Sequence, residues 1–237
     1  PRKTIDHLLS FFADLGVNVS GIIPISAALQ NVVQQMNSAP SETLAVIECG
    51  ASITELNIYR NGCLAFSRKL SVAGKDITES LMTTLASEHG KLQLNFQQAE
   101  EIKQKYGMIA SEEDQWVEDK ISTSQILSLV RPRIEQLVSD IESSLDFYRE
   151  ESRGGTVNRI LLFGGGSSLL GLAPFLSRQL GIKVEVGHPL EWIKAPSDVH
   201  IQDPSMAGLF GMAIGAAAGG VKGFGLSRAK SINLLPV

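Results

Sequence analysis

The spacing of apolar side chains divides the chain into segments with helical and strand-like periods. Residues 3–15 and 96–106 carry apolar side chains three or four positions apart, and glycine follows each run, which predicts two helices. The longest such pattern, from Ile126 to Tyr148, predicts one helix that contains Pro132. A charge-free run at 206–221 is too short to span a membrane and predicts a helix buried inside the core. Further helices are expected at 27–36, 74–86 and 169–180.

Short apolar runs bounded by turn residues predict the strands. Asn61-Gly62 separates the runs 55–59 and 63–70 and is typical of a tight hairpin, because both residues tolerate positive φ. The run 44–48 precedes this hairpin, so three antiparallel strands are expected. Further strands are expected at 17–25, 159–163 and 183–186. Together with the helices, they predict a mixed α/β fold in which a hairpin set joins a strand–helix–strand unit.

Breaks in the pattern and the composition limit the remaining choices. Residues 38–41 form a Ser-Ala-Pro-Ser break that marks a domain boundary, and the polar stretch 111–120 is expected to be a surface loop. A net charge of -4 without a basic block argues against nucleic acid as the partner. The two cysteines, Cys49 and Cys63, cannot build a disulfide framework, which favours a reducing, cytosolic setting.

Three consecutive glycines, Gly164, Gly165 and Gly166, follow a strand-like run and precede Ser167. Glycines at this place let a ligand approach the backbone and leave N–H groups free for phosphate. The Walker pattern is absent, and the dinucleotide-binding fingerprint fails because Leu169 stands where it needs its last glycine. On these residues alone, a phosphate-binding loop and a tight structural turn remain equal alternatives.

A second glycine turn joins two predicted strands and carries a carboxylate at its start. Gly50, Ser52 and Thr54 are small enough to surround a phosphate, and Glu48 is placed to position metal-bound water. An ordinary polar hairpin turn is the alternative reading of the same residues.

A third feature lies on the predicted helix 96–106. Glu100 and Lys103 are three residues apart, so they share one face of this helix. They fit on either side of a ribose, although a solvated ion pair is the commoner meaning of such a spacing.

The order of these features resembles that of the actin-like ATPases, and residues 72–78 and 141–148 are most similar to the PilM branch of that superfamily. The resemblance runs from Ile5 to Ala217. It implies that the turn after Glu48 is a phosphate-binding hairpin, that the Ala-Glu-x-x-Lys helix contacts ribose and adenine, and that the glycine triplet forms an adenosine loop. The implied binding residues are Gly50, Ser52, Thr54, Gly74, Glu100, Lys103, Gly164, Gly165, Gly166 and Ser167, with Glu48 as the catalytic residue near Mg²⁺.

The fold implied by this resemblance is the α/β actin-like (ribonuclease H-like) ATPase fold, mostly its second lobe with a helix-rich insertion. Residues 1–40 are expected to be a remnant of lobe 1, and residues 41–217 to form lobe 2. Within lobe 2, residues 41–70 and 155–217 would form the sheet core and residues 71–154 the insertion. No initiator Met and no match to the first phosphate loop are present, so we expect the chain to lack its N-terminal part.

The function implied by the resemblance is that of a cytoplasmic ATP-binding component of the type IV pilus assembly platform, at the inner face of the inner membrane. ATP and Mg²⁺ would be its cofactors, and turnover would be slow at most, since Glu48 replaces the usual aspartate. The alternatives are a non-catalytic scaffold of a pilus or type II secretion platform and a cell-division actin homologue. Self-association is also implied, and contact with the membrane would be indirect.

The end of the chain carries a different motif. Residues 218–237 are expected to be a flexible tail. Its Ile232, Asn233, Leu234, Leu235 and Pro236 resemble the N-terminal tail of PilN, an inner-membrane protein that docks by this motif onto the ATPase. The motif is open to three interpretations: the start of a natural fusion, a tethered partner peptide, or the protein's own tail.

Overall fold

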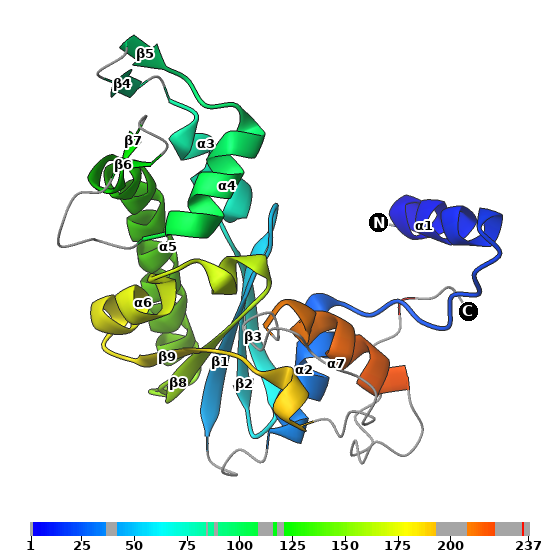
Figure 1. Ribbon diagram of the computed structural model, residues 1–237. Coiled ribbons are helices and arrows are strands. Elements are labelled where there is room, and N and C mark those ends of the chain that lie inside the picture. The colour runs from blue at the N-terminus through cyan, green and yellow to red at the C-terminus, as the bar shows by residue number, and fades with distance from the viewer. Residues whose placement is uncertain are drawn as a thin grey trace.

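The core of the protein is a five-stranded mixed sheet with the order β3-β2-β1-β8-β9 (Figure 1). The computed structural model describes residues 2–36, 42–83, 85–87, 90–108, 116–117, 121–192, 208–220 and 234. Strands β1, β2 and β3 are antiparallel, whereas β8 and β9 run parallel to β1. The strands span Thr43–Cys49 (β1), Thr54–Arg60 (β2), Cys63–Leu70 (β3), Arg159–Phe163 (β8) and Lys183–Val186 (β9).

The predicted hairpin is confirmed at the tip between β2 and β3. Asn61 and Gly62 have φ values of 54° and 71°, as a two-residue hairpin turn requires. Arg60 pairs with Cys63, and a bulge between Ile58 and Tyr59 shifts the register beyond it. The predictions for the three antiparallel strands and for β8 and β9 are therefore confirmed.

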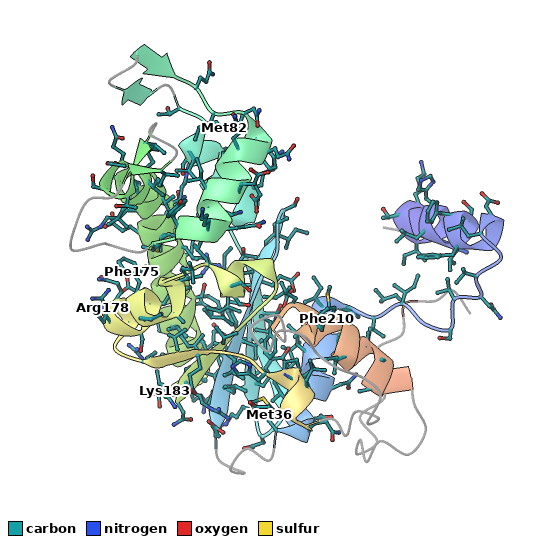
Figure 2. All side chains as sticks on the ribbon, in the orientation of Figure 1. Met36, Met82, Phe175, Arg178, Lys183 and Phe210 are labelled. Carbon is teal, nitrogen blue, oxygen red and sulfur yellow. The ribbon has the colours of Figure 1, made fainter. Side chains whose placement is uncertain are left out.

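Helices cover both faces of the sheet, so β1 is buried along its whole length. On one face, Ala45 and Ile47 pack with the long helix α5 (Thr123–Glu151) and with α6 (Leu172–Leu180). On the other face, Leu44 and Val46 pack with α2 (Ile25–Gln35), which contacts α7 (Gly211–Gly220). Phe175 from α6 and Met36 after α2 accordingly lie on opposite sides of the sheet (Figure 2).

An insertion follows β3 and extends away from the sheet (Figure 1). It contains α3 (Gly74–Leu81), α4 (Phe96–Tyr106) and two small two-stranded sheets. The prediction of a helix to residue 86 is wrong, because α3 ends at Leu81 and the chain then pairs as a strand. The small sheets are β4 (Leu85–Ser87) with β5 (Gly90–Leu92) and β6 (Trp116–Val117) with β7 (Ile121–Ser122).

Strand pairing differs from the prediction in two segments, residues 17–24 and residues 116–117. Residues 17–24 are described without strand structure, since β3 and β9 form the edges of the large sheet and neither pairs with this run. Within the predicted surface loop 111–120, the described pair Trp116–Val117 forms β6, and Val117 is buried. The predicted boundary at 38–41 lies outside the described residues.

The helices at the two ends of the chain differ from each other in how they pack. Helix α1 (Arg2–Asp14), which confirms the prediction for 3–15, has no buried residue and lies apart from the sheet (Figure 1). Within the part of α7 whose burial is described, residues 211–219, only Gly211, Gly215 and Ala218 are buried, so the expectation that this helix is enclosed by the core is wrong. None of the described helices is long and apolar enough to cross a membrane.

Candidate functional site

The candidate site lies where the parallel neighbours β1 and β8 reach their carboxyl ends. Glu48 of β1 is paired with Phe163 of β8, so the turn after β1 and the glycine loop after β8 leave the sheet side by side. In open α/β sheets, ligands bind outside the carboxyl ends of the strands. The two glycine motifs of the sequence therefore meet at the edge of the sheet where a ligand is expected.

Two of the three loop glycines are required by close packing against β1. Gly164 has a φ of 79°, and a Cβ there would lie 2.6 Å from the carbonyl oxygen of Cys49. A Cβ on Gly166 would lie 2.6 Å from the Cβ of Cys49. Gly165 differs, because it is exposed and the nearest atom to its Cβ position is 3.8 Å away, on Leu209. Packing within the described protein thus explains Gly164 and Gly166 but leaves open space at Gly165.

Ser167 closes the glycine loop from within. Its hydroxyl donates to the carbonyl oxygen of Gly164 at 2.7 Å, and its N–H donates to the same oxygen at 3.0 Å. Ser167 is buried, and the N–H of Gly164 in turn donates to the carbonyl oxygen of Gly208. These bonds give Ser167 a role in the shape of the loop, and a direct contact with a ligand stays a prediction.

Glu48 carries a buried carboxylate at the base of this loop. The residue is 8% exposed, and its Oε2 has no hydrogen-bond partner. Burial, together with the negative charge of Glu55 directly opposite on β2, raises the pKa of Glu48 from 4.5 to about 7. An unpartnered carboxylate oxygen suits a hard cation, so the residue fits a role near Mg²⁺. Among the described residues, no cluster of three or more potential ligand side chains supplies a complete metal site.

The turn after β1 is closed by its own backbone. The N–H of Gly50 donates to the carbonyl oxygen of Ile53 at 2.9 Å, and a Cβ on Gly50 would lie 2.7 Å from that oxygen. Ser52 is exposed at the tip, whereas Thr54 is buried within the sheet. The structure therefore leaves Ser52 accessible to a ligand and uses Thr54 for packing.

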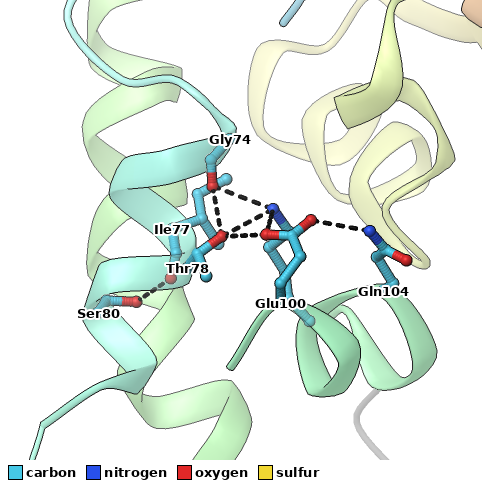
Figure 3. A network of polar contacts seen from close by, with 7 residues as sticks. Gly74, Ile77, Thr78, Ser80, Glu100 and Gln104 are labelled. Carbon is cyan, nitrogen blue, oxygen red and sulfur yellow. Dashed lines mark hydrogen bonds and ion pairs between the residues drawn. The ribbon is translucent and has the colours of Figure 1, made fainter. Parts of the chain in front are cut away.

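Helices α3 and α4 are joined by a network of polar contacts, which Figure 3 shows, and backbone hydrogen bonds connect α3 to the turn. The N–H groups of Gly74 and Lys75 donate to the carbonyl oxygens of Gly50 and Ala51, at 3.0 and 2.8 Å. The ammonium of Lys103 then donates to the carbonyl oxygen of Gly74 at 3.1 Å.

The same ammonium of Lys103 is bound by two further side chains. It donates to Thr78 Oγ1 at 2.9 Å and to Glu100 Oε2 at 2.7 Å. Thr78, which the sequence reasoning did not single out, donates its hydroxyl to Glu100 Oε2 at 2.5 Å. Its sequence signal was weak, because Lys103 and Glu100 lie more than twenty residues away and the hydroxyl's third partner, at 3.0 Å, is the backbone carbonyl of Gly74 one helical turn earlier.

Glu100 is held in its charged form by these neighbours. Burial works to raise its pKa, but hydrogen bonds from Lys103, Thr78 and Gln104 outweigh burial, so the pKa lies below 4.5. Gln104 donates to Oε1 at 2.9 Å, so both carboxylate oxygens are engaged within the protein. The Glu100–Lys103 pair is thus a partly buried element of the fold and differs from a solvated surface ion pair.

A backbone contact completes the assembly of the predicted motifs. The N–H of Met108, just after α4, donates to the carbonyl oxygen of Leu170, just after the glycine loop, at 2.7 Å. The turn, α3, α4 and the glycine loop are therefore connected in one circuit. Two cavities lie elsewhere: one of about 210 Å³ between α4 and the small sheet β6–β7, and one of about 350 Å³ beside β9.

The predicted partner motif is described only at Leu234. Its N–H donates to the carbonyl oxygen of Ile22 at 2.8 Å, and its side chain is exposed. Ile232, Asn233, Leu235 and Pro236 lie outside the described residues.

Similar structures share this architecture over most of the chain. A solved PilM–PilN type IV pilus biogenesis complex is 25% identical and covers 93% of this chain and 59% of its own, with a TM-score of 0.72. MreB5 of Spiroplasma citri bound to ADP is 16% identical and covers 90% of this chain and 63% of its own, with a TM-score of 0.63. The second likeness supports the actin-like fold alone.

Sequence comparison adds a family and a more distant relative. The cell division protein FtsA of Staphylococcus epidermidis is 25% identical over 171 residues, which are 68% of this chain and 34% of that protein. The chain thus spans about a third of the length of the curated relatives that it matches. The family model for the type IV pilus assembly protein PilM matches residues 17–218. The chain therefore belongs to the PilM family of type IV pilus assembly proteins and has their actin-like fold.

Proposed function

We propose that this PilM-type protein binds ATP with Mg²⁺ at the carboxyl ends of β1 and β8. Two features of this site carry the proposal together. Gly165 has open space at its Cβ position, and a buried carboxylate oxygen of Glu48 has no hydrogen-bond partner. Relatives of the same fold, among them MreB5, have been solved with ADP or AMPPNP. When bound, the nucleotide would supply the phosphoryl group whose presence or loss distinguishes two states of the site.

The residues of this chain would divide the work of binding. Gly165 would allow the adenosine to approach the loop, and Glu100 would face the ribose. The Gly50 and Ala51 carbonyls point toward α3, so phosphate would be bound by N–H groups of the turn and by the Ser52 hydroxyl. Glu48 would orient the hydrated cation. The division into a remnant of lobe 1 (1–40), lobe 2 (41–217) and a tail belongs to the same proposal.

In the cell, the protein would act as the cytoplasmic component of the type IV pilus platform at the inner face of the inner membrane. It would communicate its nucleotide state to a PilN-type partner through that partner's N-terminal tail. Support comes from the PilM family match and from the solved relative, whose described assembly contains PilN.

The test is a titration of fluorescent Mg-ATP into the natural full-length protein. Gly165→Arg fills the open space with a large cationic side chain and is expected to abolish saturable binding. Gln179→Arg places the same side chain on an exposed position of α6 and should bind as the wild type does. A wild-type protein that does not bind Mg-ATP would overturn the proposal.

A non-catalytic scaffold is the second candidate, and the state of Glu48 favours it. A carboxyl with a pKa of about 7 is partly protonated near neutral pH, which weakens its hold on a hydrated cation. Phosphate release measured at saturating Mg-ATP separates the candidates. Phosphate release by the wild type that disappears in Glu48→Gln indicates an ATPase. A wild-type protein that binds Mg-ATP but releases no phosphate indicates a non-catalytic scaffold.

A further inference from the structure

The ammonium of Lys103 has no hydrogen left for a ligand. A lysine side chain offers three N–H donors, and these have three acceptors inside the protein: the Gly74 carbonyl, Thr78 Oγ1 and Glu100 Oε2. The Lys103 side chain is only 12% exposed. A direct contact with a nucleotide would require breaking one of these bonds in a partly buried place, which is costly.

The acceptors of Lys103 are the points that fix α3 against the turn. Gly74 is both the acceptor for Lys103 and the donor to the carbonyl of Gly50. A Cβ on Gly74 would lie 3.3 Å from that carbonyl oxygen and 3.6 Å from Lys103 Nζ, so the three groups are packed closely. Gly74 therefore links Lys103 of α4 to the backbone of the turn.

Thr78 supplies the geometry that holds this arrangement together. It is fully buried, and its single hydroxyl accepts from Lys103 and has two acceptors within reach, Glu100 Oε2 at 2.5 Å and the Gly74 carbonyl oxygen at 3.0 Å. Without the hydroxyl, the carboxylate and the ammonium would each lose a partner in a place with little access to water.

We propose that Thr78 and Lys103 are positioning residues that fix the turn at Gly50–Ser52 relative to Glu100. Gly74, Thr78, Glu100 and Lys103 together form what we call the α3–α4 joint. Lys103 acts through this joint and makes no contact with the nucleotide. The inference rests on the proposed function, because it assigns the joint to a nucleotide site, but the joint itself can be tested without nucleotide.

The first experiment measures Mg-ATP affinity of the full-length protein with Thr78→Val, Lys103→Met and the double substitution. Each single change is expected to weaken binding about tenfold, and the double change no further, because both disable the same joint. Thr78→Ser keeps the hydroxyl and should restore wild-type affinity. Ser80→Ala removes a hydroxyl whose one hydrogen bond to a described residue is to the carbonyl oxygen of Ile77 within α3, and it serves as the matched control. Additive losses, or wild-type affinity in Thr78→Val, would overturn the proposal.

The second experiment uses hydrogen exchange in the absence of nucleotide. The amides of Gly74 and Lys75, which donate to the turn, should exchange at least tenfold faster in Thr78→Val and Lys103→Met and normally in Thr78→Ser and Ser80→Ala. If Thr78→Val does not fold, Lys103→Met carries the measurement alone. Unchanged exchange in the folded variants would refute the joint. If the variants exchange faster but the wild-type protein does not bind Mg-ATP, the result would support the joint and refute only the proposed function.

Discussion

At the scale of single residues, the buried carboxyl of Glu48 makes the stability of the protein depend on pH. Its pKa rises from 4.5 to about 7 on folding, so the folded state holds this proton more tightly than the unfolded state does. The stabilisation is complete below pH 4.5 and is lost as the pH rises toward about 7. The wild type should lose about 3 kcal/mol of unfolding free energy over this pH window, and Glu48→Gln should not.

Urea unfolding between pH 4 and 8 measures this difference between Glu48→Gln and the wild type. Glu100 works in the opposite sense, since its lowered pKa adds stability above pH 4.5 that is lost on acidification. The comparison therefore uses the difference between the two proteins at each pH. Glu55→Gln is the control, because removing the opposing charge should move the window to lower pH. Parallel curves for wild type and Glu48→Gln would contradict the expectation.

Adjacent glycines of the loop should respond differently to the same change. Gly164→Ala places a Cβ on the Cys49 carbonyl at a positive φ, and we expect it to cost about 2 kcal/mol of unfolding free energy. Gly165→Ala has open space and should change stability by less than about 0.5 kcal/mol. Thermal unfolding of both variants checks the contrast. Equal losses would mean that packing explains Gly165 as well, and the case for a ligand there would fall.

The sequence indicated part of this site, and the missing part has a physical reason. Glycine, carboxylate and turn patterns are local, so Glu48, Gly50 and the triplet at 164–166 could be identified along the chain. Thr78 could not be identified, since a buried threonine on a helix gains its role only from Lys103 and Glu100, which tertiary packing brings to it. The state of Glu48 depends likewise on burial and on Glu55 across the hairpin.

At the scale of elements, prediction succeeded where the local signal was complete. The Asn61-Gly62 turn and the long apolar stripe of α5 each determine an element without help from elsewhere. The run 17–25 has the composition of a strand, but strand formation also needs an edge to pair with. The helix that begins at Gly74 ends before the predicted residue 86, because residues 85–87 pair as a strand with β5.

The packing of α7 on α2 is closest at Gly215. A Cβ at Gly215 would lie 2.0 Å from the carbonyl oxygen of Ala28, and Asn31 donates to the Gly215 carbonyl at 2.8 Å. Gly215→Ala is expected to destabilise the protein by about 2 kcal/mol, although alanine favours the helix itself. Ala216→Leu adds more volume on the exposed side and should be nearly neutral. Chemical unfolding separates the two, and a stabilised Gly215→Ala would contradict the close crossing.

At the scale of the whole molecule, two helices from opposite parts of the sequence, α2 and α7, meet on one side of the sheet. Helix α2 precedes the sheet in sequence and α7 follows it, yet the two pack together. Beyond them, the N–H of Leu234 donates to the carbonyl of Ile22. The motif at Ile232–Pro236 is thus tied to the N-terminal segment of its own chain at the one residue of the motif that the structure describes.

A tail held on its own chain should compete with a partner that carries the same motif. We expect replacement of residues 232–236 by a Gly-Ser stretch of equal length to strengthen binding of a labelled PilN-type peptide, Ile-Asn-Leu-Leu-Pro, at least tenfold. The reason is concentration, because a tethered segment competes at an effective concentration on the order of millimolar. Fluorescence anisotropy of the labelled peptide with the full-length protein measures the change, and Ala216→Leu serves as a variant altered elsewhere on the same side. Unchanged affinity would show that the tail does not occupy the partner's place, and the interpretation as a tethered partner peptide would then be wrong.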